Sequence, residues 1–304
     1  MRFLISGATG LIGARLSQRL REQGHQIAIL SRSLEKGQRL GYETIVWQPE
    51  QEPLAATALE GVDVVVHLTG EHIAAGRWTP EQKRRIRDSR VLSTRHLLAA
   101  MRASAVQPKA FICASAIGFY GDRGDEMLTE QAAPGTGFLS DICQEWEAEA
   151  AAAQVLGIRT VHARIGIVLA RPEEGGALQQ MVLPFKLGLG ASLGNGQQWF
   201  PWVHIADVVG LLEHAIRTET LSGAMNTVAP NVVTNAEFTD TLAAALHRPS
   251  LFAVPGFMLR LGLGEMADMM LGSVRVIPAV ALASGYQFQF PLLRAALADL
   301  FSPR

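Results

Sequence analysis

The first twenty residues, MRFLISGATGLIGARLSQRL, place the strongest constraint on the fold of this chain. The short apolar run RFLIS has the composition of a strand that is buried on both faces, and it stops at Gly7. Ile12, Leu16 and Leu20 then recur at the spacing of one helix face. The sequence therefore predicts a strand, a glycine-rich turn and a helix in immediate succession.

Three glycines in this turn, Gly7, Gly10 and Gly13, follow the pattern GxxGxxG. The first permits a tight turn, the second lets the backbone approach a pyrophosphate, and the third lets the helix pack closely on the strand. The free N–H groups and the positive dipole end of the helix then face an anion. A glycine-rich turn that binds nothing has the same pattern, but its position directly after a strand favours a dinucleotide site.

The second expected strand, QIAILS, is followed by Arg32 between Ser31 and Ser33. An acid at this place would hydrogen-bond the ribose hydroxyls of NAD and repel a 2′-phosphate. Arginine instead matches a phosphate, because its planar fork donates two hydrogen bonds. An arginine that simply faces solvent is the alternative. The missing acid favours the first interpretation, and we predict that the cofactor is NADP(H).

Further apolar runs at 61–70, 110–121 and 158–170 alternate with helical segments, among them 80–103 with Thr79 as its N-cap. This alternation predicts an α/β fold, a Rossmann-like doubly wound parallel sheet with a smaller C-terminal lobe on the substrate side. We expect a dinucleotide-binding domain at 1–230, with 171–202 contributing to the substrate side, and the smaller lobe at 231–304. Parallel sheets bind ligands at the carboxyl ends of their strands. The end of the run at 61–70, with the residue that follows it, is therefore expected to line the cofactor, at Leu68, Thr69, Gly70 and Glu71.

Composition narrows the function classes. The net charge of −1 gives no reason to expect nucleic acid or an anionic membrane as a partner. The basic run at 83–90 is typical of a solvated helix face, although one of its arginines could reach the cofactor phosphates. Cys113 and Cys143 match neither a metal-ligand spacing nor a disulfide framework, so we expect no metal and a cytoplasmic location. No apolar stretch approaches the roughly 18 residues of a membrane span.

Several motifs together resemble the extended short-chain dehydrogenase/reductases, the sugar-nucleotide epimerase and dehydratase group. They are GATGLIG, VDVVVHLTG, ASAIGFYG, ARIGIVL and WVHIADVV. The stretches LTGEHIAAGRW, WEAEA, GLGASLGNGQQWFPWVHIAD and VIPAVALASGYQFQFP are similar to one atypical epimerase-like branch whose C-terminal segment is a domain of unknown function. The resemblance covers essentially the whole chain. It implies an NADP-binding Rossmann fold with cofactor contacts at Gly7, Thr9, Gly10, Leu11, Ile12, Gly13, Ser31, Arg32, Leu68, Thr69, Glu71, Arg85, Arg90 and Val168, beside Arg164.

The same resemblance exposes a departure from the parent group, which uses a tyrosine, a lysine four residues later, and a serine or threonine. Ser115 matches the serine. Phe138 stands where the tyrosine belongs and Ile142 where the lysine belongs. A phenyl ring cannot transfer a proton, so the usual Tyr–Lys mechanism is absent.

Tyr120 is a candidate replacement, because it follows the same strand end as Ser115 and carries a titratable hydroxyl. Its pKa would have to fall, and Arg123 or Arg164 could lower it if close. The alternative is a packed tyrosine whose hydroxyl makes one structural hydrogen bond. His204 and Asp207 suggest a dyad by their spacing, but we expect Asp207 to cap the following helix instead.

Two functions from different classes remain open. One is an NADP-dependent, epimerase-like oxidoreductase with an unconventional proton donor and a small-molecule substrate. The other is a non-catalytic NADP(H)-binding redox sensor or regulatory protein. Fold analogy cannot separate them, because fold does not fix function. The resemblance also makes a homodimer a reasonable expectation, through the helices near 80–103 and 140–156, and a monomer is equally compatible with the sequence.

Overall fold

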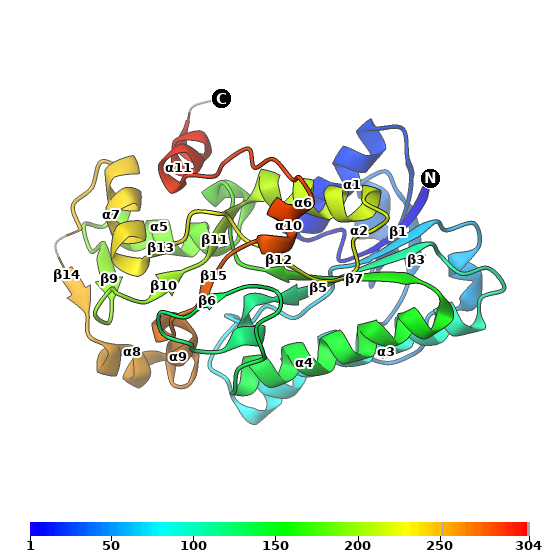
Figure 1. Ribbon diagram of the computed structural model, residues 1–304, viewed down its shortest axis with the longest axis horizontal. Coiled ribbons are helices and arrows are strands. Elements are labelled where there is room, and N and C mark those ends of the chain that lie inside the picture. Colours follow the sequence, from blue (N-terminus) through cyan, green and yellow to red (C-terminus); the bar gives the residue numbers. More distant parts are fainter. Residues whose placement is uncertain (251, 303–304) are drawn as a thin grey trace.

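A computed structural model describes residues 1–250 and 252–302, and its centre is one seven-stranded sheet (Figure 1). Neighbouring strands are parallel throughout, in the order β12-β7-β5-β4-β1-β2-β3. The expected α/β, Rossmann-like sheet is thereby confirmed. The strands are β1 (Arg2–Ser6), β2 (Gln26–Ser31), β3 (Glu43–Val46), β4 (Val64–His67), β5 (Ala110–Ala116), β7 (Arg159–Ile165) and β12 (Gly223–Thr227).

The central strands are short runs of apolar residues because helices cover both faces of the sheet. All four residues of β4 are buried, as are the last four of β1. β3, at one edge, has no buried residue. Continuous apolar runs of this kind are what a parallel sheet with two covered faces requires.

Two pairs of helices form the outer layers. α1 (Leu11–Glu22) and α6 (Ile205–Arg217) pack on one face, and α3 (Pro80–Ala103) and α4 (Phe138–Ala151) pack on the other (Figure 1). The Thr79 side chain accepts a hydrogen bond from the Gln82 N–H, which confirms the expected N-cap of α3. α2 (Leu34–Arg39) lies beside β3.

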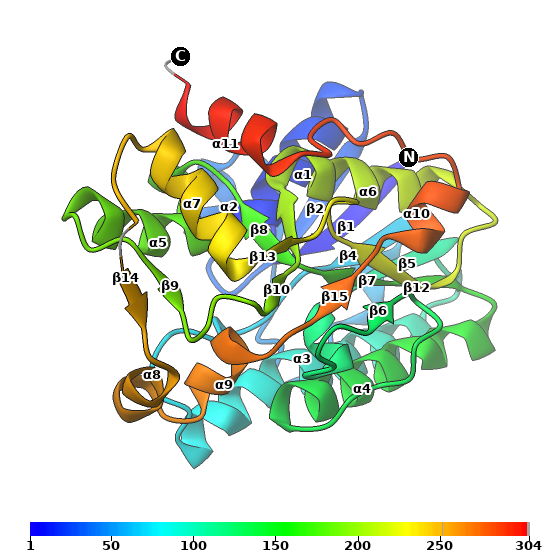
Figure 2. The same ribbon diagram turned by 60° about the vertical axis from the view of Figure 1, so that its left-hand side comes forward.

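The remaining elements other than α10 gather beyond the carboxyl ends of the strands (Figure 2). α11 packs on α7, α10 packs beside β12, and the pair β6–β15 joins residues that are far apart in the sequence. The strands are β6 (Met127–Leu128), β8 (Ile167–Leu169), β9 (Ala191–Leu193), β10 (Trp199–Phe200), β11 (Trp202–His204), β13 (Val233–Thr234), β14 (Phe252–Val254) and β15 (Arg275–Val276). The helices are α5 (Ala177–Lys186), α7 (Asn235–Ala245), α8 (Gly256–Leu263), α9 (Met266–Leu271), α10 (Ala279–Ala283) and α11 (Leu293–Phe301).

Strand order fixes where a ligand fits. From β1 the chain proceeds to β2 and β3 on one side, and then returns to β4, β5, β7 and β12 on the other. The crevice of such a sheet lies outside the carboxyl ends of the strands, where the order reverses. Here that point is between β1 and β4. Among the described residues, no helix is both long enough and apolar enough to cross a bilayer.

Candidate functional site

The turn between β1 and α1 has the geometry that its glycines predict. Gly7 has φ +73°, and a Cβ there would lie 2.8 Å from the backbone carbon of Leu68. A Cβ on Gly13 would lie 2.3 Å from the Gly7 carbonyl oxygen, so α1 could not pack this closely on the turn with any other residue. A Cβ on Gly10 would meet only that same oxygen, at 3.4 Å. Gly7 and Gly13 are therefore required by the fold, whereas Gly10 keeps space open.

The N-terminus of α1 faces this open space. Gly10 is the N-cap residue, and in the described part of the chain no side chain caps the first turn. Thr9 and Gly10 are exposed, and Leu11 and Ile12 are half-buried. An uncapped helix N-terminus with free N–H groups is a suitable place for a phosphate group.

The end of β2 forms a compact polar turn. The Ser31 hydroxyl donates to the Ser33 carbonyl at 2.9 Å, and the Ser33 hydroxyl in turn accepts from Lys36 N–H at the start of α2. Arg32 takes no part in these bonds and is exposed. The turn thus holds its backbone in place by its serines and leaves the guanidinium of Arg32 available for a ligand.

The end of β4 is tied to α3. The Ser89 hydroxyl accepts from Glu71 N–H at 2.9 Å, and Arg90 donates to the Glu71 carbonyl at 3.0 Å. A Cβ on Gly70 would lie 3.1 Å from the guanidinium carbon of Arg90. Burial lowers the pKa of Arg90, whose guanidinium also lies over the Trp146 ring.

These contacts bring Gly70 and Glu71 together with Arg90 at the carboxyl edge, while Leu68 and Thr69 lie against Gly7. Arg85 is placed differently. It is exposed and pairs with Glu81 one turn earlier on α3 at 2.6 Å. Val168 lies on the short strand β8, where it pairs with Val203 and is half-buried.

A buried polar network closes the ends of β5 and β7. Ser115 and Arg164 are register partners on these strands. The Ser115 hydroxyl donates to Glu147 Oε1 at 2.6 Å, and Arg164 donates to both carboxylate oxygens of Glu147 at 2.8 Å. Glu147 comes from α4, so one helix and two strands meet in a single ion pair.

Tyr120 belongs to the same network, on the far side of Arg164. Its side chain is fully buried, its hydroxyl donates to Asn226 Oδ1 at 2.7 Å, and it accepts from Arg164 Nη1 at 2.9 Å. Burial raises the pKa of Tyr120 more than Arg164 lowers it. Arg123 pairs with Glu126 instead. This arrangement favours the structural alternative for Tyr120, since a proton donor near neutral pH needs a lowered pKa.

The position where the resemblance predicts the parent group's tyrosine is apolar and aromatic in the structure. Phe138 begins α4, and its ring contacts Trp78 edge-on with centroids 5.1 Å apart. Lys83 Nζ lies 4.9 Å from the centroid of the Phe138 ring, and Ile142 is buried one turn further along α4. Neither substituted position carries a group that can transfer a proton.

Glu147 is the residue whose position sequence reasoning undervalued. Cys143, Trp146, Glu147 and Ala150 have the i, i+3, i+4, i+7 spacing of a buried helix face. A carboxylate on such a face needs a buried partner, and this signal could have pointed to the ion pair. Nothing in the sequence indicates that the partner is Arg164.

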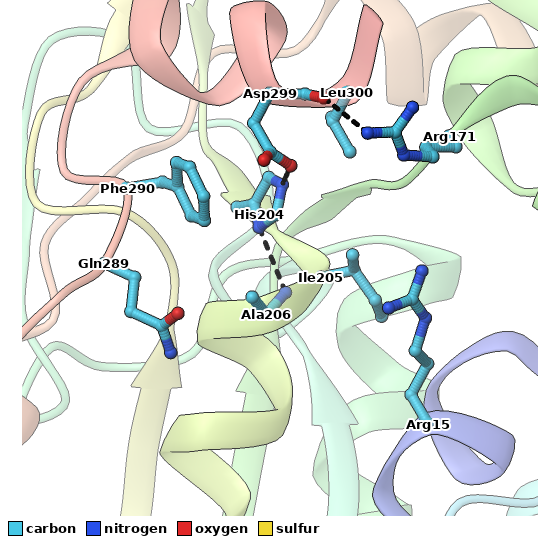
Figure 3. Close-up of a pocket in the computed structure, with 9 residues that line it drawn as sticks. All are labelled: Arg15, Arg171, His204, Ile205, Ala206, Gln289, Phe290, Asp299 and Leu300. Atoms are coloured by element: carbon cyan, nitrogen blue, oxygen red, sulfur yellow. Dashed lines mark hydrogen bonds and ion pairs between the residues drawn. The ribbon is translucent and has the colours of Figure 1, made fainter. Parts of the chain in front are cut away.

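A cavity of about 310 Å³ lies between α1, α6 and α11 (Figure 3). His204 Nδ1 accepts from Ala206 N–H and its Nε2 lies 3.3 Å from Asp299. His204 is therefore the N-cap of α6, and the expectation that Asp207 caps this helix is wrong. Asp207 is buried and accepts instead from the backbone N–H groups of Gln289 and Phe290, because the C-terminal segment passes over it.

The comparison with protein families agrees with this geometry. A family model described as the NAD dependent epimerase/dehydratase family matches residues 3–228, and a domain of unknown function (DUF1731) matches residues 254–300. The chain belongs to the NAD dependent epimerase/dehydratase family. The resemblance to an epimerase-like branch with a C-terminal domain of unknown function is confirmed.

Relatives that match this chain over nearly its whole length come from distant organisms. The mouse epimerase family protein SDR39U1 is 40% identical over 99% of this chain and 99% of its own length. The Bacillus subtilis (strain 168) epimerase family protein YfhF is 36% identical over 100% of this chain and 99% of its own. The crystal structure of human SDR39U1 (isoform 2) with NADPH superimposes with a TM-score of 0.88 at 35% identity, covering 99% of both chains.

Proposed function

We propose that this protein binds NADP(H) across the carboxyl edge of β1, β2, β4 and β5, and that it is an epimerase-like oxidoreductase acting on a small molecule. The exposed Arg32 at the end of β2 is the observation that carries the cofactor assignment. The exposed guanidinium there matches a 2′-phosphate, and positions 31–33 carry no acid that would bind the ribose hydroxyls of NAD. The human relative crystallised with NADPH supports the same assignment.

The rest of the cofactor follows from the strand order. The pyrophosphate lies on the uncapped N-terminus of α1, over Gly10. The segment from Leu68 to Glu71 lines the crossing from the adenosine half to the nicotinamide half, with Arg90 behind it. The nicotinamide end then reaches β5 and β7, near Ser115 and Val168. When bound, the cofactor supplies a hydride donor or acceptor.

Chemistry at this end has to rely on Ser115 rather than on Tyr120. The tyrosine hydroxyl is committed to Asn226 and Arg164, and its pKa is raised. Ser115 lies at the carboxyl end of β5 and has a polar partner in Glu147. A serine alone is a weak acid and a weak base, so its neighbours decide what it can do.

A non-catalytic NADP(H)-binding sensor is the second candidate. It is favoured by the replacement of two proton-transfer residues with Phe138 and Ile142, together with the buried state of Tyr120. A sensor needs a difference in affinity between the two redox forms of the cofactor. An enzyme needs a substrate, and turnover in a screen of hydroxyl and carbonyl compounds would decide for it.

The first experiment is a competitive titration of the purified protein with NADPH, NADP⁺ and NADH, followed by the fluorescence of bound NADPH. We expect NADPH to bind at least tenfold more tightly than NADH, since one charge-assisted phosphate contact contributes roughly 1.5–3 kcal/mol. Equal affinity for NADPH and NADH would reject the role of Arg32. The homodimer and the cytoplasmic location remain predictions, and light scattering of the same sample tests the first.

A further inference from the structure

The ion pair between Glu147 and Arg164 lies next to Ser115, at the end of the site where the proposed function places the nicotinamide. The Arg164 side chain is 5% exposed and that of Glu147 is 12% exposed. A buried ion pair is weak evidence for stability, because its desolvation cost is comparable to the attraction it provides. Because stability alone does not account for this ion pair, its position at the cofactor site suggests a function there.

The two charges of this pair face different neighbours. On its outer side the Arg164 guanidinium lies 3.4 Å from the centroid of the Phe119 ring and donates to the Tyr120 hydroxyl at 2.9 Å. Its inner side faces Glu147, and Glu147 in turn receives the Ser115 hydroxyl at 2.6 Å. Glu147 Oε1 accepts from both Arg164 and Ser115, so the carboxylate lies between the guanidinium and the serine hydroxyl.

The position of the Glu147 carboxylate next to the hydroxyl determines the role that Ser115 can play. A serine hydroxyl has one proton, and here that proton is donated to a carboxylate. The lone pairs of the oxygen remain, beside the negative charge of Glu147 and the buried thiol of Cys143, which is also a hydrogen-bond neighbour of Ser115. Toward a ligand, Ser115 is consequently a hydrogen-bond acceptor at negative potential.

The two redox forms of the cofactor differ in charge at this end, because the oxidised nicotinamide ring is a cation and the reduced ring is neutral. We propose that Glu147, acting through Ser115, is a positioning residue that favours the oxidised form, NADP⁺, over NADPH. The inference rests on the proposed function, which places the nicotinamide at the ends of β5 and β7. The buried cation Arg90 lies beside Gly70 and interacts with Cys143, and it stays in place in every variant below.

The test compares the affinities of NADP⁺ and NADPH in Glu147→Gln with those of the unaltered protein, by calorimetry and by fluorescence. The substitution leaves the charge of Arg164 uncompensated, so NADP⁺ should bind about tenfold more weakly while NADPH changes little. Glu149→Gln is the matched control. Glu149 lies on the same helix and also pairs with an arginine, Arg95, but on the protein surface, and its substitution should leave both affinities unchanged.

A second variant covers the case in which Glu147→Gln does not fold, as a thermal melt would reveal. Glu147→Gln/Arg164→Met removes both charges, which proteins tolerate better than one unpaired charge. The negative charge beside Ser115 is lost in this variant too, and the ratio of NADP⁺ to NADPH affinity should fall about threefold. A ratio equal to that of the unaltered protein, in either folded variant, overturns the inference while NADP(H) binding stands. Failure of the unaltered protein to bind either form would instead reject the proposed function itself.

Discussion

The two ends of the carboxyl edge of the sheet are built in different ways. At the β1 and β2 end the site consists of backbone and one exposed arginine, with glycines that leave room for a ligand. At the β5 and β7 end it consists of buried side chains that already satisfy one another, from Ser115 to Asn226. The first end is ready to hold a cofactor by its backbone, whereas the second holds a fixed charge arrangement beside it.

Because of this difference, the residues that would bind the cofactor are distinct from those that would carry out proton transfer. A phosphate site made of backbone N–H groups depends on a local turn and survives changes elsewhere. A proton-transfer site depends on a few side chains with shifted pKa values, and these can be replaced while the fold remains. Here Phe138 and Ile142 stand at the positions where the resemblance predicts the tyrosine and the lysine, and Glu147 accepts a hydrogen bond from Ser115 nearby.

The largest effect is expected from Gly13→Val, which tests whether the first end depends on backbone packing. The new side chain would clash with the Gly7 carbonyl, at 2.3 Å already for its Cβ. We expect the free energy of unfolding to fall by about 3 kcal/mol and NADPH binding to be lost, measured by urea denaturation and fluorescence titration. Gly10→Ala is the comparison. It should cost less than about 1 kcal/mol of stability and still weaken NADPH, and equal stability losses would contradict the division between the two glycines.

Arg32→Ala sharpens the comparison at the one side chain on which the first end relies. The affinity for NADPH should fall by about ten- to a hundredfold, and that for NADH should hardly change, because only NADPH carries the 2′-phosphate. Competitive fluorescence titration measures both. Arg39→Ala, an exposed arginine of the neighbouring helix α2, should alter neither affinity. Parallel losses for both cofactors would show that Arg32 acts on the turn and not on the phosphate.

β4, the strand between the two ends, makes the free energy of unfolding depend on pH through His67. Burial lowers the pKa of His67 to about 3, and its neutral ring bonds Ser6 of β1 and Ser93 of α3. The unfolded chain, with a histidine pKa near 6.5, takes up the proton more readily, so stability is complete above about pH 6.5 and falls as the pH drops toward 3. Between pH 7 and pH 5 this group alone should remove about 2 kcal/mol.

Denaturation curves of the unaltered protein and of His67→Gln at pH 7 and pH 5 measure this contribution. The variant is less stable at pH 7, and its further loss on acidification should be smaller by about that amount. Burial also lowers the pKa of His162, which therefore adds a loss of the same sign in both proteins. Identical losses in the two proteins would show that His67 is not the titrating group.

Tyr120→Phe gives the smallest expected effect and could break the comparison. If the tyrosine is structural, its loss removes one hydrogen-bond partner each from Arg164 and Asn226 and lowers the free energy of unfolding by about 1–2 kcal/mol. The affinity for NADPH should stay within about threefold. Should a substrate be found, loss of turnover in this variant with unchanged stability would return Tyr120 to a catalytic role.

Local sequence was sufficient for the parts of the molecule that depend on neighbours in the chain. The apolar run before Gly7, the glycine spacing and the N-cap at Thr79 each fix backbone conformation over a few residues, and the structure has them as expected. The parallel sheet followed from the alternation of such segments, since a parallel pair requires a crossover. The open turn at Arg32 is local in the same sense.

Tertiary structure decided what depends on residues brought together from far along the chain. Glu147 meets Ser115 across 32 residues, and Tyr120 meets Asn226 across 106. Asp207 binds backbone that lies more than 80 residues later, and so His204 is left to cap α6. Periodicity shows that such a side chain is buried, but the identity of its partner depends on how the strands and helices pack. For this protein, the sequence alone determined the fold and a place for a dinucleotide, and packing decided the charge pattern beside it.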